Sequence, residues 1–263
     1  MKKPAWVIDK ERARREAANA TVWLFGLHAV RDALLNPARD KLRLMVTRNA
    51  ADKLSDAIAT AGIPPEVVDT RKFAPPIDAH SVHQGAALEA RPLDWGPLAA
   101  CCAQGTGDMP DRPPRVVLLD RVSDPHNVGA ILRSAEVFGA RAVIAPRHHS
   151  APETGALAKA ASGALERQPY LRVRNLADAM QELRAMGYLL LGLDGDATSD
   201  IDAALHGARD RAVGLVLGAE GPGLRPRTRQ TCDALVRIGA AGGFGSLNVS
   251  NAAAVALYAA RGA

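Results

Sequence analysis

The chain has 263 residues, of which 48% are hydrophobic and 4% are aromatic, and its formal net charge is +5. This length suits two domains and supplies enough apolar residues for a sizeable core. The scarcity of aromatic side chains disfavours a base-stacking platform for single-stranded nucleic acid. The mild basicity is compatible with a polyanionic partner.

The cysteines and the N-terminus indicate the compartment. Cys101, Cys102 and Cys232 form no CxxC pair, which is typical of reduced cytosolic thiols, so we expect a cytoplasmic protein. No run of about 18 apolar residues predicts a membrane-spanning helix. Residues 1–20 are basic and lack the apolar stretch of a secretory signal, so we expect a flexible tail there.

Residues 21–92 predict a small unit in which strands alternate with helices. The alternation of Leu42, Leu44 and Val46 indicates a strand, and Pro37 ends the preceding helix because the residue before a proline disfavours helical angles. In chain order, we expect a strand at Val22–Phe25, a helix at Leu27–Leu35, a strand at Lys41–Thr47, a helix over 50–61, and short strands at Val67–Val68 and Ala86–Leu88.

Residues 93–114 are rich in proline and lack periodicity, which is typical of a linker, with one short helical turn expected at Cys101–Cys102. From there to residue 263 the pattern of strand, loop and helix repeats. Apolar strands that alternate with helices predict an α/β fold with a parallel sheet covered on both faces. The expected strands are 116–119, 142–145, 170–173, 188–193, 213–217 and 234–238, and the expected helices are 128–138, 156–161, 176–186, a short one from about 225, and a last one from Ser246.

Three segments of this second unit place polar groups and glycines beside strand ends and helix starts. They are residues 124–133, 217–224 and 246–250. Open α/β sheets bind ligands at such positions. No segment reads as a dinucleotide fingerprint or a P-loop, and no His/Cys/Asp cluster has metal-ligand spacing, so the sequence predicts no metal site.

The first segment has a structural interpretation beside the functional one. Asn127 stands where we expect a helix N-cap, a position that asparagine favours. Arg133 lies about 9 Å further along the helix axis, at 1.5 Å per residue. An ion pair with Glu136 at i+3 would explain it without a ligand.

The other two segments also allow both a structural and a functional interpretation. Glu220 follows a buried strand in a glycine-rich turn, where it is either a turn carboxylate that accepts local N–H bonds or a site residue. Ser246 is explained as the N-cap of the last helix. Asn248, in the expected first turn of that helix, has less structural reason to be there.

Taken together, the segments resemble the motifs of the SpoU-type, or TrmH-like, RNA ribose 2′-O-methyltransferases of the SPOUT superfamily. Residues 124–133 resemble the first motif, residues 217–224 the second (Gly-x-Glu-Gly-x-Gly), and residues 246–250 the third (Ser-Leu-Asn-Val-Ser). Three ordered motifs at matching spacing are far more specific than one glycine-rich loop. The resemblance covers about residues 114–263.

The first unit carries a second resemblance. Phe25–Val30 (Phe-Gly-Leu-His-Ala-Val) and His83–Gly85 (His-Gln-Gly) are similar to the L30e-like RNA-binding domain found in one branch of that family. The resemblance implies an L30e-like domain at 21–92, a linker at 93–114 and a SPOUT methyltransferase domain at 115–263. It also implies a deep trefoil knot in the second domain, an exception to the rule that chains avoid threading.

The family's cofactor is S-adenosylmethionine, bent against the knotted loops. The resemblance implies that it contacts Leu217, Gly218, Gly223, Ile238 and Leu247. It also implies a homodimer whose active site is completed across the interface. The family often continues its last strand with Ile-Pro-Met; this chain instead has Gly239 and Ala240 after Ile238, so we expect the loop over 241–245 to be mobile without ligand.

The resemblance implies methyl transfer to a ribose 2′-oxygen of structured RNA, with 23S ribosomal RNA guanosine as the expected target. The implied catalytic residues are Asn127, Arg133, Glu220, Ser246 and Asn248. Arg133 either draws off the hydroxyl proton with help from an RNA phosphate or pins that phosphate, since arginine is very hard to deprotonate. Two alternatives are a tRNA guanosine 2′-O-methyltransferase and a non-catalytic RNA-binding or ribosome-assembly protein on the same scaffold.

Overall fold

The computed structural model describes residues 21–78, 80–104, 113–241 and 247–261, and it divides into two compact units. The first unit runs to Asp94 and also takes in Glu153–Lys159, where Glu153 pairs with the buried side chain of Arg39. The second unit comprises the rest, from Trp95 onward.

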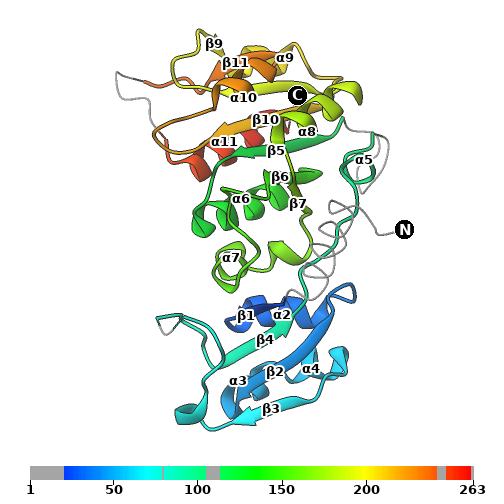
Figure 1. The fold of residues 1–263 in the computed structure, drawn as a ribbon, viewed down its shortest axis with the longest axis vertical. Coiled ribbons are helices and arrows are strands. Elements are labelled where there is room, and N and C mark those ends of the chain that lie inside the picture. The colour runs from blue at the N-terminus through cyan, green and yellow to red at the C-terminus, as the bar shows by residue number, and fades with distance from the viewer. Residues whose placement is uncertain (1–20, 79, 105–112, 242–246, 262–263) are drawn as a thin grey trace, which may run out of the picture. The chain divides into compact units, whose positions relative to one another are not determined.

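The first unit is built on a four-stranded sheet with the order β1-β4-β2-β3, in which β4 is antiparallel to both neighbours (Figure 1). The predicted helix over 50–61 was wrong as a single element, because the chain leaves helical geometry at Leu54 (φ −106°, ψ 6°). The elements are β1 (Val22–Phe25), α2 (Leu27–Leu35), β2 (Lys41–Thr47), α3 (Arg48–Lys53), α4 (Ser55–Ala61), β3 (Pro65–Val68), the short 3₁₀ turn η1 (Thr70–Lys72) and β4 (Ala86–Ala90).

Within this unit, the two motif segments meet. The backbone N–H of Leu27, at the start of α2, donates to Oε1 of Gln84 over 3.1 Å. Gly85 has a φ of +76°, and a Cβ there would lie 2.4 Å from Oγ1 of Thr47. The His-Gln-Gly turn therefore requires its glycine and supports the start of the first helix.

The second unit contains a seven-stranded sheet with the order β7-β6-β5-β10-β8-β11-β9. Every pairing in it is parallel, which confirms the predicted parallel sheet. Its strands are β5 (Arg115–Asp120), β6 (Ala142–Pro146), β7 (Tyr170–Val173), β8 (Leu189–Leu193), β9 (Ser199–Asp200), β10 (Val213–Gly218) and β11 (Ala234–Arg237).

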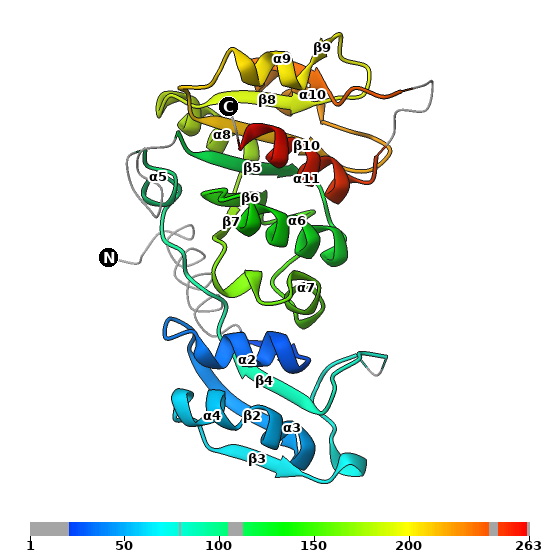
Figure 2. The same cartoon turned by 180° about the vertical axis from the view of Figure 1, so that it is seen from behind.

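Helices cover both faces of this sheet (Figures 1 and 2). One face carries α6 (Pro125–Val137), α9 (Ile201–His206) and α11 (Val249–Ala260), and the other carries α5 (Leu98–Cys101), α8 (Leu176–Ala185) and α10 (Pro226–Thr231). The chain also forms α7 (Gly155–Ala161) and η2 (Ala164–Glu166). The sequence reading missed β9 and α9, since the short helix buries only Ile201 and Leu205 and leaves little periodicity to detect.

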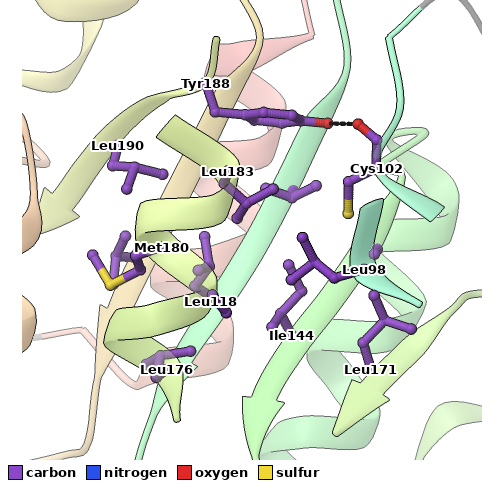
Figure 3. Close-up of a cluster of buried hydrophobic side chains, with 14 of the residues drawn as sticks. Leu98, Cys102, Leu118, Ile144, Leu171, Leu176, Met180, Leu183, Tyr188 and Leu190 are labelled. Atoms are coloured by element: carbon purple, nitrogen blue, oxygen red, sulfur yellow. Dashed lines mark hydrogen bonds between the residues drawn. The ribbon is translucent and has the colours of Figure 1, made fainter. Parts of the chain in front are cut away.

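A cluster of buried hydrophobic side chains lies between the sheet and α8 (Figure 3). The Tyr188 hydroxyl donates to the carbonyl of Cys102 over 2.8 Å, which satisfies a buried polar group. Burial raises the pKa of Cys102 to about 12 and that of Cys232 to about 12, and it raises the pKa of Tyr188 as well.

Candidate active site

The predicted site segments lie at one edge of the second unit's sheet. In a parallel sheet all carboxyl ends share an edge, and ligands bind there. Asp120 and Gly218, the last residues of β5 and β10, are register partners. The loops that leave these two strands therefore begin side by side.

The helix caps differ from the sequence expectation. Asp124, and not Asn127, is the N-cap of α6, and its Oδ1 accepts from the N–H of His126 over 2.9 Å. Pro125 occupies the first helical position, where its missing N–H costs nothing. Asn127 therefore lies inside the first turn, with its side chain available for contacts outside the helix.

The last helix also begins later than expected. Asn248 is the N-cap of α11, and its Oδ1 accepts from the N–H of Ser250 over 2.9 Å. The interpretation of Ser246 as the cap was thus wrong, and Ser246 itself lies outside the described residues, as do residues 242–245 of the loop expected to be mobile.

Glu220 connects the three segments through one carboxylate oxygen. Its Oε1 accepts from Nδ2 of Asn248 at 2.6 Å, from Nδ2 of Asn127 at 3.2 Å, and from the N–H of Val249 at 3.4 Å. Nδ2 of Asn248 also donates to Oδ1 of Asn127 over 3.1 Å. We call Asn127, Glu220 and Asn248 the polar cluster.

The hydrogen bonds of the polar cluster show that Glu220 is more than a turn carboxylate that accepts local N–H bonds. Its hydrogen-bond donors come from α6 and the start of α11, which are 93 and 28 residues away in the chain, and not from its own turn. Bonds to a carboxylate are stronger than bonds between neutral groups. Glu220 thus holds the two asparagine side chains in defined orientations at the sheet edge.

The glycine turn before and after Glu220 has a steric requirement. A Cβ on Gly218 would lie 2.2 Å from the carbonyl carbon of Gly223, because residues 219–223 fold back on the strand end. The N–H of Gly223 closes this turn on the carbonyl of Ala219 over 2.9 Å. Gly221 and Gly223 adopt φ values of +81° and +66°, which glycine allows without strain.

Asp120 is a site residue that the sequence reasoning missed. Its fully buried carboxylate accepts from Nε of Arg225 at 2.6 Å and from the N–H of Arg225 at 2.9 Å. This pair fixes the end of the glycine turn to β5. A carboxylate at the end of an otherwise apolar strand was the available signal, because an unpaired charge would not be buried there.

No hydrogen bond joins Arg133 to the polar cluster in the described residues. The expected ion pair with Glu136 was wrong, since Glu136 pairs with Arg167. Arg133 is exposed, and no hydrogen bond or ion pair joins it to another residue in the described part of the chain. It shares a helix face with Val137, which is 75% exposed.

Of the five residues expected to contact a cofactor, Leu217, Gly218 and Gly223 lie at or after the carboxyl end of β10, Ile238 follows β11, and Leu247 precedes α11. Leu217 is buried, and Gly218 and Gly223 shape the turn. Ile238 is half-buried, whereas the Leu247 side chain is 46% exposed beside the polar cluster. This edge therefore offers apolar side chains and main-chain groups next to a fixed carboxylate.

In the described part of the chain, no three His, Cys, Asp or Glu side chains gather in a way that could hold a metal ion. Nor does any helix in that part of the chain have the length and apolar character needed to cross a membrane.

Family comparisons account for both units. Residues 114–258 match the SpoU rRNA Methylase family, and residues 23–95 match the family described as RNA 2′-O ribose methyltransferase substrate binding. The chain belongs to the SpoU rRNA methylase family. The first match contains all three motifs, and the second contains the Phe-Gly-Leu-His and His-Gln-Gly segments.

Relatives with assigned activities span nearly the whole chain. A 23S rRNA (guanosine-2′-O-)-methyltransferase RlmB from Vibrio vulnificus is 36% identical over 90% of this chain and 94% of its own length. The protein of the same name from Ralstonia nicotianae is 38% identical over 89% of this chain and 93% of its own length.

Solved structures share the fold. The SpoU methyltransferase AviRb from Streptomyces viridochromogenes, in complex with AdoMet, has a TM-score of 0.77 at 22% identity and covers 94% of this chain and 92% of its own. An AdoMet-bound rRNA methyltransferase from Sinorhizobium meliloti has a TM-score of 0.75 at 23% identity, covering 95% and 90%.

Proposed function

We propose that this protein transfers a methyl group from S-adenosylmethionine to the ribose 2′-oxygen of a guanosine in 23S ribosomal RNA. The observation that carries the proposal is the polar cluster, in which one carboxylate oxygen of Glu220 binds side chains from the other two family motifs. Relatives named for this reaction, which match the chain over about nine-tenths of its length, support the substrate. Work on ribosomal RNA is consistent with a cytoplasmic location.

The residues at the carboxyl ends of β10 and β11 fit the proposed cofactor. Ile238 and the exposed Leu247 offer apolar contacts, and the turn from Gly218 to Gly223 lets a ligand approach the main chain. When bound, S-adenosylmethionine supplies an electrophilic methyl group on a sulfonium, whose departure as a neutral thioether needs neither an acid nor a metal.

The chain's own residues orient the reacting hydroxyl. Asn127 and Asn248, both held by Glu220, present amide groups suited to a ribose or to the motif loops. Arg133, exposed and without an ion-pair partner in the described residues, is suited to pin an RNA phosphate bidentately. Ser246 is proposed to bind substrate or the loop. Positioning of this kind is a large share of what an enzyme supplies for a bimolecular transfer.

In a homodimer, the exposed Arg133 would lie near the interface between the two copies. The exposed side chains of Val137, Val255 and Tyr258, 75%, 43% and 53% exposed, lie on α6 and α11, which pack together. Exposed apolar patches mark interaction sites. We propose that a second copy covers this face and that the active site is completed across the interface.

The family also suggests the topology and the domain roles. We propose a trefoil knot in the second unit, consistent with β11 reaching past β8 before the chain returns to α11 beside β10 and β5. We further propose that residues 21–92 form an L30e-like domain that binds RNA, linked by 93–114 to the methyltransferase domain.

Labelled methyl transfer and calorimetry test the proposal together. Purified protein with labelled S-adenosylmethionine should methylate unmodified 23S ribosomal RNA, and it should bind the cofactor alone in calorimetry. Transfer to tRNA instead would favour the tRNA alternative. Absence of both transfer and cofactor binding would favour a non-catalytic RNA-binding protein.

Arg133→Ala probes the assigned role further. We expect it to abolish transfer while the cofactor affinity stays nearly unchanged, because the role concerns RNA. A large loss of cofactor binding would contradict that assignment.

A further inference from the structure

A basic pocket lies at the carboxyl edge of the sheet in the second unit. Its volume is about 870 Å³, and it is formed by the loop after β6, the junction between β7 and α8, and the start of α10. The residues that carry charge or polarity in its wall are His148, His149, Arg174, Asn175, Arg225 and Arg227, together with Asp178.

The pocket has an excess of positive charge. Asp178 is the single acidic residue of its lining and pairs with Arg227 over 3.3 Å, where both side chains are more than 60% exposed. Such exposed pairs contribute little and exchange readily with other ions. Arg174 is exposed and has no ion-pair partner in the described part of the chain. Arg225 uses its Nε on Asp120, which is one of five N–H donors of the guanidinium.

The histidine rim is held in place by its own turn. The N–H of Arg147 donates to the carbonyl of Val173 over 2.7 Å, and the buried Ser150 hydroxyl donates to the carbonyl of Pro146. His149 adopts a left-handed φ of 60° between these anchors, a conformation that histidine tolerates better than most residues. The two imidazoles therefore lie on a turn fixed at both ends.

The pocket and the polar cluster lie at the same edge of the sheet, because the pocket's lining follows the carboxyl ends of β6 and β7 and includes Arg225, which follows the glycine turn after β10. Arg225 follows Glu220 by five residues, and the same Asp120–Arg225 pair that fixes the glycine turn also fixes this side of the pocket. The pocket and the proposed ribose site are therefore open to the same RNA strand along one edge of the sheet.

We infer that this pocket binds the phosphodiester backbone of the substrate RNA next to the target nucleotide, an inference that rests on the proposed function. Its lining has no aromatic ring besides the imidazoles, so it offers no platform for stacked bases. Contacts of arginine to phosphates position a nucleic acid and carry no sequence information. The pocket thus orients the RNA, while the target is selected elsewhere.

Charge reversal at Arg174 tests this inference against a matched control. RNA binding by Arg174→Glu and Arg209→Glu would be measured with in vitro transcribed 23S ribosomal RNA across a salt series. Arg209 is exposed between α9 and β10, away from the pocket lining. We expect Arg174→Glu to weaken binding at least tenfold and to reduce the salt slope by about one, and Arg209→Glu to stay within twofold of the parent.

Two control measurements and two milder variants separate the outcomes. The affinity for S-adenosylmethionine in calorimetry and the melting temperature should be the same for Arg174→Glu and Arg209→Glu. Arg174→Ala, and the double change His148→Ala and His149→Ala, should each lose less RNA affinity than Arg174→Glu. Equal RNA affinity of the two Glu variants would overturn the inference, as would loss of inorganic phosphate binding without loss of RNA binding. A parent protein that binds RNA but transfers no methyl would refute the proposed function alone.

Discussion

At the scale of single residues, the site depends on how one oxygen atom is shared. Oε1 of Glu220 accepts from three N–H groups that belong to α6 and to the start of α11. A side chain that satisfies several donors at once is hard to replace, because each donor must find another partner or water.

Glu220→Ala should lower methyl transfer by roughly 10²-fold, because a misplacement of about 1 Å at reacting groups is enough for such a loss. Glu220→Gln keeps an acceptor oxygen and should retain more activity. Steady-state transfer with 23S ribosomal RNA, beside cofactor calorimetry, measures both. Activity of Glu220→Ala within twofold of the parent would contradict the role of the polar cluster.

Asp120→Asn should destabilise the protein by about 1.5–3 kcal/mol, because it weakens the hydrogen bonds from Arg225 to a fully buried carboxylate, while the Arg225 side chain, 43% exposed, can still reach water. Asp178→Asn is the matched control, since it breaks an exposed pair worth less than about 1 kcal/mol. Urea denaturation measures the two differences in unfolding free energy. Equal effects would mean that the Asp120–Arg225 pair does not hold the turn.

At the scale of elements, sequence patterns predicted the regular parts well and the caps poorly. The strands at Val22–Phe25, a short apolar run, and Lys41–Thr47, where apolar residues alternate, have the predicted bounds. Asp124 and Asn248 both carry cap-forming side chains near a second candidate, Asn127 and Ser246. Local preference cannot decide between such neighbours, because either side chain could form the cap.

The same limit applies to the site. Motif spacing predicted that Asn127, Glu220 and Asn248 belong together, and the structure joins them. Motif spacing did not predict that Asp120 binds Arg225, because these two residues are 105 positions apart in the chain. Long-range pairs of this kind depend on the strand order, which no local pattern contains.

Gly129→Ala should destabilise the protein although alanine favours helices. A Cβ at Gly129 would lie 2.5 Å from Cβ of Ala160 and 2.8 Å from the N atom of Ala161. Overpacking costs about 1–3 kcal/mol, more than the gain of about 1 kcal/mol in helix propensity. Thermal melting measures the change, and Gly195→Ala, which meets nothing within 4 Å, should be near neutral. Similar melting of both variants would refute close packing of α6.

At the scale of the whole molecule, titratable groups buried in the core make the free energy of unfolding depend on pH in the alkaline range. Cys102 and Cys232 keep their protons in the folded state to about pH 12, and burial also raises the pKa of Tyr188. In the unfolded chain, thiols ionise near pH 9. Below that pH both states hold these protons, and above it only the unfolded state releases them, so stability falls as pH rises.

We therefore expect the unfolding free energy to decrease above about pH 9, by about 1 kcal/mol per thiol for each pH unit. Denaturation curves at pH 8 and pH 10.5 measure the decrease. A variant with Cys102→Ala and Cys232→Ala should show a smaller difference between the two pH values. An identical decrease in that variant would assign the effect to other groups.

The cap of the last helix has a consequence for how the enzyme is made. Asn248 uses its oxygen to begin α11 and its nitrogen to bind Glu220, which was synthesised 28 residues earlier. A chain that grows from its N-terminus therefore contains Asn127 and Glu220 before it contains the group that orders them. Synthesis proceeds at about 5–20 residues per second, so the growing chain has the first two motifs for roughly a second or more before the third is made. The hydrogen bonds of the polar cluster can therefore form only after the third motif has been synthesised.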